Sequence, residues 1–304
     1  MLRGAARLPL PMLDDVKRGR IALPENQIEI ATLDFGGSGP LALLHHANGF
    51  CAAVWGPVAR ALSRHFRVIA MDARGHGDSA KPAGGEPYRW EWFGRDVIGV
   101  ADALRREHGA SRIALGLGHS FGGTALITAS AQRPELFERL VLVDPIVPPQ
   151  LTPELEARRR EFGNAIADGA RRRRAVWPSR DAAREKWSGK ELFGNWDPRV
   201  FDLYLAQGLR DRPDGQVELA CPPEIEAAIF EANTSLDVMQ RASEVRVPTL
   251  ILWARAGNFA YAHYEALAAR MPRAELRVAD AGHLVPMENP ELVVREVLGF
   301  VQRS

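Results

Sequence analysis

One segment carries more information than any other part of this sequence: Arg112-Ile113-Ala114-Leu115-Gly116-Leu117-Gly118-His119-Ser120-Phe121-Gly122-Gly123. An apolar run leads here directly into Gly-His-Ser-Phe-Gly, and a helix-like run follows. This order is typical of a sharp strand-to-helix turn, in which the serine is strained and side chains two residues away would collide with the turn. Such a turn exposes the hydroxyl, and the helix N-terminus favours an anion beside it. Ser120 is therefore a candidate nucleophile; the alternative is a helix-capping serine in a glycine-rich loop.

Apolar runs alternate with helix-like segments along most of the chain. This alternation predicts the α/β class, with a doubly wound, mostly parallel sheet and helices on both faces. The first run is followed by Gly36-Gly37-Ser38-Gly39-Pro40, which indicates an antiparallel hairpin at the leading edge of the sheet. The expected strands are 28–35, 41–46, 68–71, 113–117, 140–143, 249–253 and 276–278, and the expected helices are 54–63, 91–107, 120–132, 262–269 and 288–301.

The strand pattern is interrupted after Pro145. Pro148-Pro149 opens a region up to about Gln240 in which charged, helix-like segments replace the apolar runs. We expect a helical cap at 147–240, inserted into an α/β core made of 1–146 and 241–304. The run Arg171–Arg174 would by itself suggest a nucleic-acid patch, but 14 basic and 16 acidic residues lie between 151 and 240. That balance favours a solvated or ion-paired helix face.

Composition excludes several classes of protein. The 304 residues are 46% hydrophobic and 25% charged, which is an ordinary globular balance, and the net charge of +1 gives no general attraction to nucleic acid or anionic membranes. Two cysteines exclude a disulfide scaffold and suit a reducing compartment. Prolines and the Asp14–Asp15 pair break the N-terminal segment, and glycines and polar residues interrupt 113–132. We therefore expect no secretion signal, no membrane span and a cytoplasmic location.

Three further segments accompany the serine motif. They are His46-Ala47-Asn48-Gly49-Phe50, Asp72-Ala73-Arg74-Gly75-His76-Gly77-Asp78-Ser79 and Asp280-Ala281-Gly282-His283. Together with Gly118–Gly122, they resemble the α/β-hydrolase family, in particular its serine esterases and lipases, over most of 28–301 apart from the cap. The resemblance implies that His283 is the general base, a task suited to a side chain with an unperturbed pKa of about 6.5. His76 is more simply a loop histidine.

The resemblance also implies an oxyanion hole. Its donors would be the backbone N–H groups of Asn48 and Phe121. Where relatives have His-Gly this chain has His46-Ala47, and a register shifted by one residue would place the donor at Ala47. The Asn48 side chain is a candidate third donor. His45-His46 is a poor metal pair, because adjacent strand residues point to opposite faces.

The acid that should orient His283 is not at its usual place. Most relatives keep an Asp after the strand that corresponds to 249–253, yet no Asp or Glu occurs from Val245 to Tyr264. Asp144 follows the run 140–143, where haloalkane dehalogenases and some lipases keep their acid, and it is our candidate for fixing the histidine tautomer. Asp280, Asn258 or a Ser-His dyad without an acid remain alternatives. An Asp-Pro pair such as Asp144-Pro145 is also favourable in a turn, which would explain Asp144 without a catalytic role.

These residues predict a carboxylesterase-like serine hydrolase that acts on small carboxylic esters with an apolar acyl or alcohol part. His46, Trp177, Trp187 and Trp196 are candidates for the substrate pocket, although cap-core packing also explains the tryptophans. We expect no cofactor, no metal, no nucleic acid, and a monomer or homodimer. Thioesterase, lactonase and C–C bond hydrolase activities remain open. A ligand-binding protein of this fold with little or no catalysis is the alternative from a different class.

Overall fold

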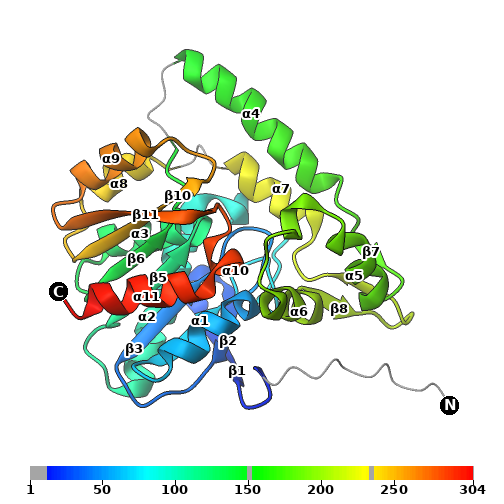
Figure 1. Cartoon of the computed structure of the whole chain (residues 1–304), viewed down its shortest axis with the longest axis horizontal. Helices are drawn as coiled ribbons and strands as arrows, with labels where there is room; N and C mark the ends of the chain where they lie inside the picture. Colours follow the sequence, from blue (N-terminus) through cyan, green and yellow to red (C-terminus); the bar gives the residue numbers. More distant parts are fainter. Residues whose placement is uncertain (1–11, 149–152, 233–235, 304) are drawn as a thin grey trace.

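The computed structural model describes residues 12–148, 153–232 and 236–303. Eight strands of the described residues form the main sheet in the order β1-β2-β4-β3-β5-β6-β10-β11 (Figure 1). From β4 to β11 all neighbours pair in parallel, which confirms the predicted mostly parallel sheet. The strands are β1 Lys17–Leu23, β2 Ile28–Asp34, β3 Leu41–His45, β4 Arg67–Met71, β5 Leu115–His119, β6 Leu140–Val143, β10 Thr249–Ala256 and β11 Ala274–Gly282.

Helices cover both faces of this sheet. Because side chains alternate along a strand, Ala42 and Leu44 face the layer that holds α1 and α11, whereas Leu41 and Leu43 face α2, α3, α8 and α9. This two-sided burial explains the nearly continuous apolar runs. The helices of the core are η1 Pro24–Asn26, η2 Ala52–Trp55, α1 Gly56–Leu62, η3 Glu86–Tyr88, α2 Trp90–His108, α3 Phe121–Gln132, α8 Val238–Ala242, α9 Tyr261–Arg270, α10 Val285–Glu288 and α11 Pro290–Val301.

The leading-edge hairpin differs from the expectation. β2 pairs antiparallel with β1, which precedes it, and on its other side with β4. The glycine-rich segment 36–40 therefore leads not to a neighbouring strand but to β3, which lies between β4 and β5. β1 was missed because its side chains are mostly exposed, so its charged sequence shows no apolar alternation.

The region between β6 and α8, which we call the insertion, contains helices as expected and also a small sheet. Its strands β7, β9 and β8 pair antiparallel in that order. They span only two or three residues each, too few to give a periodic signal. The elements are α4 Pro153–Arg171, β7 Val176–Trp177, α5 Arg180–Ser188, η4 Glu191–Phe193, α6 Pro198–Gln207, β8 Leu209–Asp211, β9 Val217–Leu219 and α7 Pro223–Glu231.

The exact limits of the expected cap stay a prediction. Pro149, near its start, and residues 1–11 lie outside the described residues. At its other end, α8 crosses position 240 and packs against α3 and α9 of the core. Within the described ranges, no helix combines the length and apolar character that crossing a bilayer would need.

Candidate active site

Ser120 occupies the turn between β5 and α3 in a strained conformation. Its φ of 55° and ψ of −121° are unusual for a residue with a side chain. A Cβ on Gly118 would lie 2.6 Å from the carbonyl oxygen of Gly122, and a Cβ on Gly122 would overlap the carbonyl oxygen of His45. The Ser120 N–H donates to Val143 O over 2.9 Å. Gly118 and Gly122 are thus required because a side chain at either position would collide with the backbone of the turn or of β3, as the motif suggested.

The structure brings Ser120, His283 and Asp144 together. His283 follows β11, and its Nε2 lies 2.9 Å from Ser120 Oγ while its Nδ1 lies 2.6 Å from Asp144 Oδ2. An Nδ1–H that donates to the carboxylate leaves Nε2 free to accept the serine proton. Asp280 is instead 78% exposed in its side chain and pairs with Arg255 at 2.5 Å. Of the two candidate acids, Asp144 therefore contacts the histidine.

The end of β10 holds Asp144 in place. Asp144 is fully buried with a φ of 43°, and its N–H donates to Leu252 O over 2.8 Å. Its Oδ1 accepts the Ala254 N–H over 3.0 Å, and a Cβ on Gly257 would lie 2.7 Å from its Oδ2. The end of β10, which has no acid of its own, thus provides a hydrogen-bond donor for the Asp144 carboxylate. The missing side chain of Gly257 leaves room for that carboxylate.

Two residues beside this group were not singled out from the sequence. His119 donates from Nε2 to His283 O over 2.8 Å, and burial keeps its pKa well below the usual value, so the ring is neutral. Tyr264, from α9, donates to Pro145 O over 3.2 Å, and burial together with the Asp144 carboxylate raises its pKa. His119 could have been noticed because it adjoins Ser120, whereas nothing in the sequence marks Tyr264.

The segment Ala47–Phe50 follows β3, the strand next to β5 in the sheet, and we call it the oxyanion turn after the role that the sequence predicts for it. The Phe50 N–H donates to Ala47 O over 3.3 Å, and Gly49 has the φ of 83° that this turn requires. The Asn48 side chain donates from Nδ2 to Glu226 O of the insertion over 3.0 Å, so its amide is already engaged. Phe121 is the first residue of α3, and its N–H has no acceptor within the helix.

Two buried histidines support the oxyanion turn from the core. His46 donates from Nδ1 to Ala47 O over 2.7 Å and accepts the Ala73 N–H at Nε2 over 3.0 Å. His76 accepts the Gly49 N–H at Nε2 over 2.9 Å. Burial lowers the pKa of His46 to about 4 and that of His76 well below its usual value, so both rings are neutral. Both ring nitrogens of His46 thus bind backbone groups. A contact of His46 with the substrate stays a prediction.

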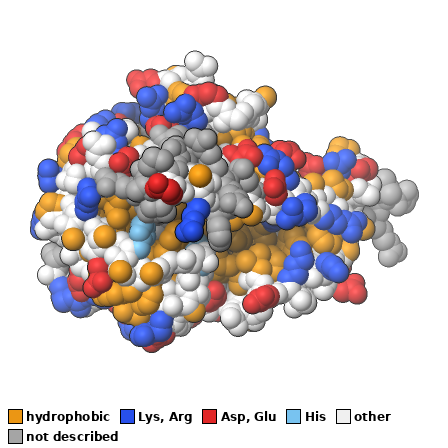
Figure 2. Space-filling view, turned by 90° about the horizontal axis from the view of Figure 1, so that it is seen from above, with side chains coloured by type: hydrophobic (Ala, Val, Ile, Leu, Met, Phe, Trp, Pro, Cys, Tyr) orange, Lys and Arg blue, Asp and Glu red, His pale blue; other side chains and the backbone are white. Residues whose placement is uncertain are grey.

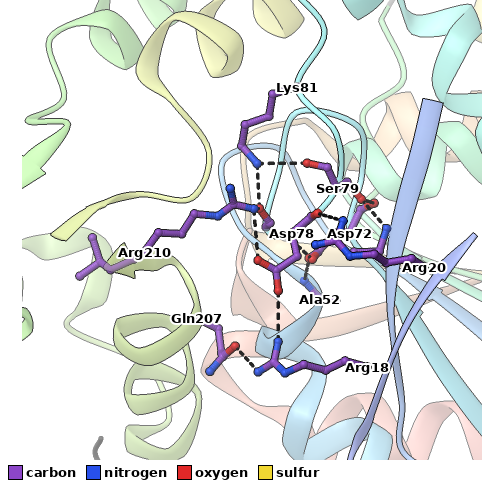
Figure 3. A network of polar contacts seen from close by, with 12 residues as sticks. Arg18, Arg20, Ala52, Asp72, Asp78, Ser79, Lys81, Gln207 and Arg210 are labelled. Atoms are coloured by element: carbon purple, nitrogen blue, oxygen red, sulfur yellow. Dashed lines mark hydrogen bonds and ion pairs between the residues drawn. The ribbon is translucent and has the colours of Figure 1, made fainter. Parts of the chain in front are cut away.

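The loop that follows β4 links the oxyanion turn to the surface. Asp72 accepts the Ala52 N–H over 2.6 Å and the Asp78 N–H over 2.9 Å, while Ser79 Oγ donates to the Asp72 carbonyl over 2.7 Å. On the outer side, Arg210 of the insertion pairs with Asp78 at 3.1 Å (Figure 3). Asp72 therefore ties this loop both to the start of η2 and to the loop's own later residues.

The three tryptophans of the insertion are buried in an aromatic cluster. Trp187 stacks on Tyr204 with ring centroids 5.4 Å apart. The ring centroids of Trp196 and of Phe50 in the oxyanion turn are 5.5 Å apart. Trp177 meets Trp187 edge to face. This arrangement matches the packing alternative, and their pocket role stays a prediction. Figure 2 shows a hollow with a largely hydrophobic floor on the side where Figure 1 places the insertion.

A separate pocket of about 440 Å³ lies at the end of β11, just before His283. It carries side chains of both charges, and Ser120 does not line it, so we do not assign it to the reacting groups. In the described ranges, no group of three or more His, Cys, Asp or Glu side chains could hold a metal ion. The pocket is lined by Asn195, Arg255, Ala256, Asp280, Ala281, Gly282, Glu288 and Asn289.

Comparison with known proteins agrees with this architecture. A model of the alpha/beta hydrolase family matches residues 42–296, and the chain belongs to this family. It is 27% identical over 282 residues to 2-(acetamidomethylene)succinate hydrolase of Mesorhizobium japonicum (strain LMG 29417 / CECT 9101 / MAFF 303099), covering 87% of this chain and 89% of that one.

Solved structures share the fold. A crystal structure of E-2-(acetamidomethylene)succinate hydrolase superposes with a TM-score of 0.77 at 23% identity, covering 94% of this chain and 99% of the other. The thioesterase domain from the curacin biosynthetic pathway superposes with a TM-score of 0.76 at 18% identity, covering 94% and 100%. At these identities the likeness concerns the fold and not the substrate.

Proposed function

We propose that the protein is a serine hydrolase that cleaves carboxylic esters with an apolar acyl or alcohol part through an acyl-enzyme on Ser120. The observation that carries the proposal is the continuous chain of contacts from Ser120 Oγ to His283 Nε2, at 2.9 Å, and from His283 Nδ1 to Asp144, at 2.6 Å. These distances are within reach for proton transfer and for orientation of the base.

In the first half-reaction, Ser120 Oγ attacks the ester carbonyl while its proton passes to His283 Nε2. The oxygen of the tetrahedral intermediate accepts hydrogen bonds from the Asn48 and Phe121 N–H groups. Asp144 stabilises the imidazolium, which then gives its proton to the departing alkoxide as the C–O bond breaks. The products of this step are an alcohol and an ester between the acyl group and Ser120.

In the second half-reaction, His283 takes a proton from water as the water oxygen attacks the acyl carbon. The tetrahedral intermediate collapses, His283 returns the proton to Ser120 Oγ, and the carboxylic acid leaves. Selectivity between esters, thioesters and lactones depends on the substrate pocket, because the reacting groups serve all three acyl transfers equally.

Turnover of p-nitrophenyl acetate, butyrate and octanoate by the wild type and Ser120→Ala tests the proposal. We expect p-nitrophenol release by the wild type, fastest with a longer acyl chain, and loss of nearly all of it in the variant. Equal rates for the two proteins would contradict the proposal and favour a ligand-binding protein. A thioester and a lactone, measured with the same two proteins, decide whether one of these is the better substrate.

A further inference from the structure

The insertion contacts the oxyanion turn directly, at the residue expected to supply a backbone donor and at the next one. Tyr204 of α6 donates its hydroxyl to Gly49 O over 3.1 Å. The carbonyl of Glu226 in α7 accepts the Asn48 side-chain amide over 3.0 Å. From the core side, His76 accepts the Gly49 N–H over 2.9 Å. Both peptide groups that follow Asn48 are therefore fixed, one by the core and the other by the insertion.

A partly buried ion pair stabilises the groups that make these contacts. Glu226 is 11% exposed in its side chain and pairs with Arg173, whose Nη2 also donates to the Tyr204 hydroxyl over 3.0 Å. A Cβ on Gly49 would lie 2.6 Å from Glu226 Oε1, so the carboxylate closely adjoins the turn. Without Arg173, this negative charge would be unpaired beside the place where an oxyanion forms, and it would oppose that charge.

The hydrogen bonds in this group run in one direction. Arg173 donates to the Tyr204 oxygen, and the Tyr204 hydroxyl in turn donates to Gly49 O. Burial raises the pKa of Tyr204 to about 12, so the hydroxyl keeps the proton that it donates. The phenol hydroxyl provides an acceptor for the guanidinium and a donor for the carbonyl at once; phenylalanine would keep the ring packing and lose both bonds.

We propose that Tyr204, Glu226 and Arg173 are positioning residues that hold the Asn48 backbone N–H in the orientation needed for the tetrahedral intermediate. This inference rests on the function proposed above. It gives the insertion a part in catalysis. A misplaced donor weakens binding of the oxyanion more than binding of the planar ester, so the variants should lose kcat with little change in KM.

Tyr204→Phe is the first test, with Tyr88→Phe as the matched control. Tyr88 is also buried and donates its hydroxyl to a backbone carbonyl, that of Pro82, over 2.8 Å. With p-nitrophenyl butyrate, we expect Tyr204→Phe to lower kcat about tenfold and to change KM less than about twofold, since part of one oxyanion contact is lost. Affinity for an alkyl trifluoromethyl ketone, which forms a tetrahedral adduct, should fall in proportion to kcat/KM. Tyr88→Phe should keep the wild-type kcat.

The ion pair is tested by removing one charge and then both. Arg173→Gln should lower kcat more than Tyr204→Phe does, because it leaves Glu226 unpaired, and adding Glu226→Gln should recover part of the loss.

A lower melting temperature with an unchanged kcat in Tyr204→Phe would overturn the inference, as would equal kcat values for Arg173→Gln and the double variant. Wild-type rates equal to those of Ser120→Ala would overturn the proposed function too, whereas an active wild type with unaffected variants would overturn this inference alone.

Discussion

Asp144 differs from an ordinary turn aspartate because both of its carboxylate oxygens are engaged. One accepts the Ala254 N–H and the other accepts the His283 Nδ1–H, and the side chain is fully buried. An amide in its place would have a similar shape but could not stabilise a positive imidazole, and its NH₂ group would favour the wrong tautomer of His283.

We therefore expect Asp144→Asn to lower kcat by about 10⁴-fold, as the loss of a triad carboxylate does elsewhere. Asp280→Asn is the control, because Asp280 is exposed and pairs with Arg255, so its rate should stay near that of the wild type. Both rates are measured with the same ester, and circular dichroism checks the fold. If Asp280→Asn were the slow variant, the assignment of the acid would be wrong.

Stability should depend on pH through the buried histidines. The pKa of His46 falls from about 6.5 in the unfolded chain to about 4 in the fold, so below pH 6.5 the unfolded state binds the extra proton. The contribution of neutral His46 to the free energy of unfolding is complete above pH 6.5 and is lost as the pH falls toward 4. Glutamine can accept the Ala73 N–H but does not titrate. The wild type should therefore lose about 2 kcal/mol more than His46→Gln between pH 7 and pH 5. Urea unfolding at the two pH values measures this, and parallel losses would contradict it.

Only part of the candidate site could be predicted from the sequence. Ser120 and His283 lie in short motifs whose neighbours impose the local geometry, and Asp144 follows from the strand that ends before it. Tyr204 could not be predicted, because it lies 155 positions from Gly49 and meets it only through the packing of the insertion. Its contact depends on tertiary structure, which no local pattern encodes.

Among the elements, the turn between β5 and α3 has no room for an added carbon at Gly122. A Cβ on Gly122 would overlap the His45 carbonyl oxygen and would lie 2.6 Å from that of His46, and backbone atoms cannot rotate away. We expect Gly122→Ala to cost about 1–3 kcal/mol and to abolish acylation of Ser120. Gly189→Ala is the control, because nothing lies within 4 Å of the added carbon. Unfolding in urea and labelling by a fluorophosphonate measure the two effects; normal labelling of Gly122→Ala would contradict the steric argument.

The elements that the sequence predicted well have a continuous or a helix-periodic apolar pattern. β6 spans the predicted residues, and α2 and α3 begin and end within one residue of them. The strands that were missed lie at the edge or in the insertion. β1 is held by backbone pairing to β2 while its side chains remain mostly exposed, so hydrophobic periodicity could not mark it.

At the scale of the whole molecule, the insertion and the sheet share one hydrophobic cluster. Trp187 and Trp196 of the insertion belong to the same buried cluster as Trp55 of η2 and Leu44 of β3. Polar contacts between the insertion and the core, such as the pair of Arg210 and Asp78, are partly exposed. They contribute little to stability compared with the buried cluster. Removal of the insertion would therefore expose apolar surface of the core.

We accordingly expect the insertion and the core to unfold in one transition, because neither can lose its structure without opening this cluster. Far-ultraviolet circular dichroism and tryptophan fluorescence should give the same midpoint in urea. Trp187→Ala should destabilise the whole molecule by about 3–5 kcal/mol and speed hydrogen exchange in β3 and β5 as much as in α6. Leu192→Ala, in the neighbouring η4 but 53% exposed, should have little effect on either measurement. Two separate transitions, or faster exchange confined to the insertion, would mean that the shared cluster does not couple the two parts.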